Sequence, residues 1–148
     1  MTNQIVRAIT DADMSALRRL AEEASREGWS FVERAVREYE SGANTFAQPG
    51  ERFWGVFQEG ECIAIGGLNR DPYLEDETVG RVRHLYVSER FRRQGLAKKL
   101  MEIIINEARL RFTVLRLGTK NPVAAAFYES LGFKRQEGPK VTHMLRLR

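Results

Sequence analysis

A short basic loop near the middle of the chain combines residue types that suit an anion site. It has the sequence Arg-Arg-Gln-Gly-Leu-Ala-Lys over residues 92–98 and runs directly into a long amphipathic segment typical of a helix. The first turn of a helix leaves backbone N–H groups without acceptors and carries the positive end of the helix dipole. Gly95 permits a tight turn or a close approach of the backbone to a ligand. One interpretation is a phosphate or pyrophosphate site, and the other is a solvated basic connection.

A second segment supports the first interpretation. It reads Asn-Pro-Val-Ala-Ala-Ala-Phe-Tyr-Glu-Ser-Leu-Gly-Phe over residues 121–133. Together with residues 92–97 it resembles the two signatures of the GCN5-related N-acetyltransferases. The first family motif is Arg/Gln-x-x-Gly-x-Gly/Ala, and the second runs from an Asn through Phe-Tyr to Leu-Gly-Phe. The two segments follow in the family's order, separated by one expected helix and one expected strand. The resemblance covers nearly the whole chain, and in the N-terminal third it is supported by element order alone.

The resemblance implies acetyl-CoA as cosubstrate, with its pyrophosphate held by the backbone N–H groups of the basic loop. In this family the strand before the loop carries a bulge and separates from the next strand, and the pantetheine arm lies in the gap. The side-chain amide of Asn121 would contact the cofactor, with helix capping as its alternative role. No metal site is expected. The implied cofactor-binding residues are Leu85, Tyr86, Val87, Arg92, Arg93, Gln94, Gly95, Leu96, Ala97, Lys98, Asn121, Ala124 and Phe127.

Attack of an amine on the thioester requires a proton acceptor, because an alkyl amine with a pKa near 10.4 is almost wholly protonated at neutral pH. Similar enzymes often use a carboxylate on or near the fourth strand, where this sequence has Arg81, Arg83 and His84. His84, with an intrinsic pKa of about 6.5, is the candidate base or water anchor, and a structural role is its alternative. The acidic residues 75–77 are a weaker candidate. Tyr128 matches the position that protonates the departing thiolate, and packing on the cofactor is its alternative role.

The first helices of the family and their connecting loop wall one side of the acceptor site. Trp29 and Phe31 are therefore candidate substrate-binding residues, with core packing as the alternative for both. The acceptor is expected to be a small-molecule or peptide amine, and the sequence does not identify it. Two functions remain open: an N-acetyltransferase that works by direct attack in a ternary complex, and a non-catalytic domain of the same fold that binds acetyl-CoA as a sensor or partner module. Similar proteins are commonly homodimers.

Hydrophobic spacing predicts the elements that must position these residues. Helices are expected from about residue 11 to Gly28, from Ser30 to Gly42, from the basic loop to about residue 108, and from Asn121 to Leu131. Strands are expected at residues 5–9, 53–57, 62–65, 79–87, 114–118, 133–136 and 141–147. The strand–helix–strand order over residues 79–118 implies a parallel pair with a right-handed crossover. The expected fold is α/β with a mixed sheet: the acyl-CoA N-acyltransferase fold, mostly antiparallel and twisted, with that parallel pair and flanking helices.

Length and composition agree with a single globular domain over residues 1–148. Hydrophobic residues make up 43% and charged residues 30%, which is ordinary. Cys62 is the only cysteine, so an internal disulfide is excluded. A cytoplasmic location is expected, because no signal peptide is evident and no apolar run approaches the roughly 20 residues that cross a bilayer. The net charge is +4, and basic residues gather without intervening acidic residues only at Arg90 to Lys99. A polyanionic cofactor explains this basic cluster better than nucleic acid or a membrane does.

Overall fold

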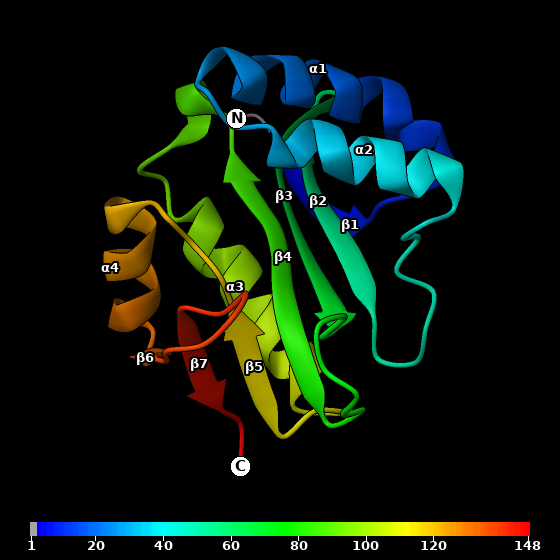
Figure 1. Cartoon of the computed structure of the whole chain (residues 1–148). Helices are drawn as coiled ribbons and strands as arrows, with labels where there is room; N and C mark the ends of the chain where they lie inside the picture. Colours follow the sequence, from blue (N-terminus) through cyan, green and yellow to red (C-terminus); the bar gives the residue numbers. More distant parts are fainter. Residues whose placement is uncertain (1–2) are drawn as a thin grey trace.

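One mixed sheet of seven strands organises residues 3–148, the part of the chain that the computed structural model describes (Figure 1). Met1 and Thr2, which the expected domain includes, lie outside the described residues. The strand order is β1-β2-β3-β4-β5-β7-β6. The elements are β1 (Gln4–Ala8), α1 (Met14–Arg26), α2 (Phe31–Ser41), β2 (Arg52–Gln58), β3 (Glu61–Arg70), β4 (Val79–Val87), α3 (Leu96–Ala108), β5 (Val114–Leu117), α4 (Pro122–Ser130), β6 (Lys134–Arg135) and β7 (His143–Arg146).

The sheet is antiparallel except for the β4–β5 pair, as the sequence predicted. Strands β2 and β3 form a hairpin whose turn residues, Glu59 and Gly60, have φ angles of 51° and 81°. Such positive values at both central positions match the twist of the flanking strands. Strand β3 extends beyond the predicted residues 62–65, because Asn69 and Arg70 continue to pair with β4.

Helices cover both faces of the sheet and bury a separate apolar cluster against each. Figure 1 shows α1 and α2 across one end of one face and α3 behind the sheet. The cluster under α1 and α2 includes Leu17, Val32 and Ile65. The cluster under α3 includes Leu100 and Ile104, which are completely buried and occur at helical spacing. Together the two layers hold the central strands β3 and β4 in place.

Strand β4 carries the β-bulge that the family resemblance implied. Across from β3, Tyr86 pairs with Ile65 and Arg83 pairs with Gly67, so two residues of β4 face one residue of β3. His84 is one of these two, and its φ angle is 59°, in the left-handed region. The bulge shifts the side-chain alternation of β4 by one residue beyond this point.

Strand β4 also separates from β5 over most of its length. The parallel pairing covers only residues 79–81 of β4. Beyond Arg81 and up to Val87, the edge of β4 that faces β5 has no strand partner among residues 3–148 (Figure 1). The backbone of this edge is therefore available for hydrogen bonds to an extended ligand.

The remaining predicted bounds agree within one or two residues, except at the end of the chain. The last two strands are shorter than predicted: β6 covers two residues and β7 covers His143–Arg146. Among residues 3–148, no helix is both long enough and apolar enough to span a membrane.

Candidate active site

The basic loop joins β4 to α3 through a short 3-10 turn at residues 89–91 and a left-handed Gly95. Gly95 has a φ angle of 79° and precedes the first residue of α3. The backbone N–H groups of residues 93–98 have no hydrogen-bond acceptor among the residues that the structure describes. The first N–H of α3 with a backbone acceptor is that of Lys99, which bonds to Gly95 O at 3.0 Å. Six consecutive free donors at a helix N-terminus fit a pyrophosphate.

Arg92, one of the predicted cofactor-binding residues, pairs through its guanidinium with a carboxylate at the end of α1. Its guanidinium donates to both carboxylate oxygens of Glu27, at 2.9 and 2.7 Å, and to Val87 O at 3.0 Å. Its backbone N–H lies 3.4 Å from Glu89 O. A bidentate carboxylate at the end of α1 therefore satisfies Arg92. Within the described part of the chain, the exposed Arg93, Lys98 and Lys99 remain outside any ion pair.

A second acidic residue of α1, Glu23, fastens the end of β4. Its carboxylate accepts hydrogen bonds from Ser88 Oγ at 2.8 Å, Glu89 N at 3.0 Å and Tyr86 Oη at 3.0 Å. Tyr86 also donates to Glu27. Burial and these two carboxylates raise the pKa of Tyr86 above its usual value, so the hydroxyl remains a donor. The helix α1 and the start of the basic loop are thereby held together.

The second signature begins at the cap of α4. Asn121 Oδ1 accepts the N–H of Val123 at 2.9 Å, which confirms a capping role and leaves the Nδ2 group free for another partner. Ala124 and Phe127 are partly buried against the cluster under α3. The predicted cofactor contacts of these residues stay predictions.

Tyr128 lies on the buried side of α4. Its ring centroid is 5.4 Å from that of Phe127 and 5.6 Å from that of Phe133. Burial raises the pKa of its hydroxyl, which remains protonated at neutral pH. Among residues 3–148 this hydroxyl has no hydrogen-bond partner, so its proton is available to a ligand.

His84 lies at the bulge, beside a stacked pair of phenylalanines, Phe46 and Phe53. Its ring centroid is 6.3 Å from the centroids of both Phe46 and Phe53. Its Nε2 is sealed from solvent and has no partner among the described residues. Burial, together with the charges of Arg83 and Arg34, lowers the pKa of His84 to about 3. The ring is therefore neutral at pH 7 and a weak proton acceptor, which suits a water anchor better than a general base.

Trp29 and Phe31 lie beside the end of β4, at the start of α2. Phe31 packs edge-on against Tyr86 with a centroid distance of 6.1 Å and is partly buried in the cluster under α1 and α2. Trp29 is 38% exposed and lies 6.3 Å from Phe31. Packing accounts for Phe31, whereas Trp29 presents an accessible ring.

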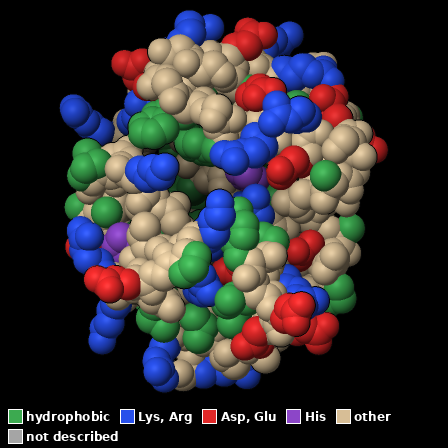
Figure 2. Space-filling view, in the orientation of Figure 1, with side chains coloured by type: hydrophobic (Ala, Val, Ile, Leu, Met, Phe, Trp, Pro, Cys, Tyr) green, Lys and Arg blue, Asp and Glu red, His purple; other side chains and the backbone are tan. Residues whose placement is uncertain are grey.

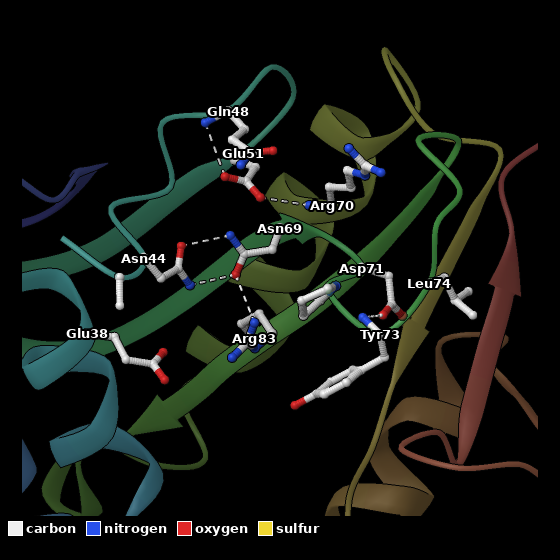
Figure 3. A pocket seen from close by; sticks show the side chains of 12 residues that line it. Glu38, Asn44, Gln48, Glu51, Asn69, Arg70, Asp71, Tyr73, Leu74 and Arg83 are labelled. Atoms are coloured by element: carbon white, nitrogen blue, oxygen red, sulfur yellow. Dashed lines mark hydrogen bonds between the residues drawn. The ribbon is translucent and has the colours of Figure 1, made fainter.

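A polar pocket of about 440 Å³ opens on the face of the sheet that α1 and α2 cover (Figure 3). Asn44 and Asn69 hydrogen-bond to each other in both directions, at 2.9 and 3.0 Å. Arg83 Nη1 donates to Asn69 Oδ1 at 3.2 Å, which places the arginine next to the bulge. The pocket is lined by Glu38, Ala43, Asn44, Gln48, Glu51, Asn69, Arg70, Asp71, Pro72, Tyr73, Leu74 and Arg83.

Sequence reasoning did not identify this pocket, because its lining comes from three separated segments that the sheet brings together. The only local signal is that Asn69 and Arg83 are polar residues on strands that are otherwise largely buried. The acidic residues 75–77, the weaker candidate for a base, are exposed and lie outside this lining. Asp76 caps its own turn by accepting from Thr78 N at 2.9 Å, and Glu77 pairs with Arg70 at 3.4 Å.

Comparison with known proteins identifies relatives of this chain in sequence and in fold. The Acetyltransferase (GNAT) family matches residues 14–133. The uncharacterized N-acetyltransferase YjgM of Escherichia coli is 29% identical over 141 residues, which cover 88% of this chain and 81% of YjgM. Human N-acetyltransferase 8 is 32% identical over 94 residues, or 60% of this chain and only 41% of that protein.

Solved structures agree with the sequence relatives. A structure from Exiguobacterium sp. 255-15, described as an acetyltransferase, is 30% identical with a TM-score of 0.86, covering 97% of this chain and 93% of that one. The protein yncA of Salmonella typhimurium, solved with its cofactor acetyl-CoA, has the same fold at 17% identity and a TM-score of 0.72, covering 98% of this chain and 94% of that one. From the family match and the Exiguobacterium relative together, this chain belongs to the GNAT family of acetyltransferases.

Proposed function

We propose that this acyltransferase moves the acetyl group of acetyl-CoA to a primary amine by direct attack within a ternary complex. The observation that carries the proposal is the junction of two free backbone surfaces. Within residues 3–148, the unpaired edge of β4 ends at Val87, and the six unpartnered N–H groups of residues 93–98 follow it after the short turn formed by residues 88–92. One surface suits a diphosphate, and the other suits an extended chain of amides such as pantetheine. Family membership supports an enzyme rather than a non-catalytic binding module.

The residues at this junction fit acetyl-CoA. The backbone N–H groups of residues 93–98 would hold the pyrophosphate, with Arg93 and Lys98 adding charge at the loop surface. The backbone of residues 85–87 would bond to the pantetheine arm, on the edge that β5 leaves open. Asn121, through its free Nδ2 group, Ala124 and Phe127 would line the other side from α4.

When bound, acetyl-CoA supplies a thioester; acetyl transfer forms a C–N bond and breaks the C–S bond. A protonated amine must therefore lose two protons from its nitrogen, one of them before attack, and one proton must reach the sulfur. Tyr128 holds a proton at Oη with no competing acceptor among residues 3–148. A thiol pKa near 8.5 makes proton donation by Tyr128 helpful but not essential. Because Nε2 of His84 is sealed from solvent, His84 would hold a water through its other ring nitrogen, Nδ1, and that water would relay the amine protons to solvent.

Replacement of Gly95 by Glu tests the cofactor site directly. Gly95→Glu adds bulk and negative charge beside the six N–H groups, and calorimetry should show CoA affinity reduced by at least about a hundredfold. Gly42→Glu is the matched control, because Gly42, at the C-terminal end of α2, has a similar φ angle of 84° and, like Gly95, open space where a side chain would begin. The control should bind CoA like the wild type. Equal CoA affinity in Gly95→Glu and wild type would refute the proposed site.

A further inference from the structure

We propose that the pocket beside the bulge, lined by Arg83 and Glu38, selects an amine acceptor that also carries a carboxylate, such as a free amino acid. This inference rests on the proposed acetyl transfer and names the class of its acceptor. The pocket lies on the α1–α2 face, and its lining residue Arg83 comes directly before the bulge in β4, the strand whose open edge is one of the two proposed cofactor surfaces. Its volume of about 440 Å³ lies within the usual range for small-molecule sites.

Arg83 is the cation that would bind the carboxylate. Its one hydrogen bond within the described residues goes to a neutral group, Asn69 Oδ1, at 3.2 Å. The other arginine that lines the pocket, Arg70, already pairs with Glu77 at 3.4 Å. A half-buried guanidinium without a carboxylate partner retains donors in the fork geometry that fits a carboxylate.

A buried charge cluster around Asp71, a lining residue, adds positive charge next to the pocket. Asp71 is completely buried and lies 3.4 Å from both Arg81 Nη1 and Arg116 Nε. Two buried arginines thus share one carboxylate, which leaves one positive charge uncompensated in this cluster. Arg81 also lies 4.7 Å from the centre of the Tyr73 ring, a lining residue. Figure 2 shows Lys and Arg side chains gathered around the hollow in the middle of this face.

Glu38 gives the pocket a complementary negative group. Its carboxylate has no hydrogen-bond or ion-pair partner within residues 3–148, and Figure 3 shows it reaching from α2 into the same space as Arg83. By contrast, the carboxylate of Glu51 is occupied by Gln48 N at 3.1 Å and Arg70 N at 3.0 Å.

One free cation and one free carboxylate match a zwitterion, whose ammonium group faces Glu38 and whose carboxylate faces Arg83. A phosphate with its higher negative charge would be repelled by Glu38. An amine without an acidic group would leave Arg83 without a partner. Both therefore suit the pocket less well than a free amino acid.

Matched acceptors test this assignment. Amino acids with several side chains, their amides and their decarboxylated amines are each incubated with acetyl-CoA, and release of free thiol is followed. The acids should be acetylated with a kcat/KM at least about tenfold above that of the amides, the size expected for a charge-assisted hydrogen bond. In Arg83→Gln this preference should fall to about one through a higher KM for the acids, and Arg83→Lys should retain part of it.

Arg37→Gln is the matched control, since Arg37 is exposed on α2, pairs with Glu33 at 2.7 Å and lies outside the pocket lining. It should keep the full preference for acids. Amides acetylated as well as acids, or a preference unchanged in Arg83→Gln, would overturn the inference while acetyl transfer stands.

If no amine is acetylated, a binding measurement still tests the proposed pocket. N-acetyl amino acids and their amides are titrated by calorimetry into the protein with CoA present. Binding of the acids at least about tenfold tighter than that of the amides, lost in Arg83→Gln, would support the pocket even if the proposed acetyl transfer failed. Equal affinities for acids and amides would overturn it.

Discussion

Burial sets the protonation states of the two side chains proposed to take part in catalysis. Tyr128, packed between Phe127 and Phe133, has a raised pKa and keeps its proton at neutral pH. His84, buried beside two arginine charges, has a pKa lowered to about 3 and stays neutral. Burial thus keeps the Tyr128 hydroxyl protonated, so that it remains a proton donor, and keeps the His84 ring uncharged.

Tyr128→Phe should slow turnover without weakening cofactor binding. The change removes the proton donor and keeps the ring packing, so kcat should fall by about a hundredfold, toward the lower end of the general-acid range. Thiol release with a saturating amine measures kcat, and calorimetry checks that the affinity for CoA is retained. Tyr39→Phe, which alters a half-buried tyrosine on α2, should have no comparable effect. Unchanged turnover in Tyr128→Phe would assign Tyr128 to packing alone.

His84 should make the fold less stable as the solution is acidified. Its pKa is about 3 in the folded chain and 6.5 in the unfolded chain, so the unfolded chain takes up a proton that the folded chain excludes. The stability present above pH 6.5 is therefore lost progressively between pH 6.5 and about 3. Asparagine tolerates the positive φ angle at this position, and His84→Asn should show a shallower loss in urea titrations across that window. Parallel pH profiles for the two proteins would contradict the burial of a neutral imidazole.

At the scale of elements, the spacing of apolar residues along the sequence predicted where most of the helices and strands begin and end. The bounds of β4 agree with the prediction, and α3 starts within the predicted loop-to-helix junction, because apolar spacing and a glycine are local signals. The pairing of Arg92 with Glu27 joins residues far apart in sequence, so no local pattern indicated it. The Arg83 pocket has the same character, since its lining depends on how the sheet stacks three separate segments.

An ion pair between the exposed Arg7 and the buried Asp13 joins β1 to the start of α1. Asp13 accepts two hydrogen bonds from Arg7, at 2.8 and 2.9 Å, and one from Thr10 N at 2.8 Å. The hydrogen bonds from Arg7 lower the pKa of Asp13 from 3.8 to about 2, although burial opposes the shift. The ionised form therefore stabilises the fold above about pH 4, and this contribution disappears as the pH falls toward 2.

Asp13→Asn should lower the free energy of unfolding by about 2 kcal/mol at pH 7, the size of this pKa shift. Urea denaturation at pH 7 and at pH 2 measures the difference between variant and wild type, which should shrink at the lower pH. Arg37→Gln removes an exposed pair on α2 and should cost about 0.5 kcal/mol or less. An equal difference at both pH values would show that the ion pair is not the cause.

At the scale of the whole molecule, the proposed cofactor site connects elements that are otherwise packed in separate layers. Strand β4 contributes Val82 to the cluster under α3 and Tyr86 to the cluster under α1 and α2. The start of the basic loop is fastened to α1 by Glu23 and Glu27, and α4 packs on the cluster under α3 through Ala124 and Phe127. A ligand along β4 would therefore contact three parts of the fold at once.

Acetyl-CoA should consequently raise the thermal stability of the whole fold. At about 100 times its dissociation constant, a ligand that binds only the folded chain adds about 2.7 kcal/mol, which corresponds to roughly 5–10 °C in Tm for a chain of this size. Thermal unfolding followed by circular dichroism, with and without acetyl-CoA, measures the shift. Gly42→Glu should show the full increase and Gly95→Glu almost none at the same ligand concentration, because only the second variant places a carboxylate beside the free N–H groups. An equal increase in both variants would mean that the ligand stabilises the fold from another surface.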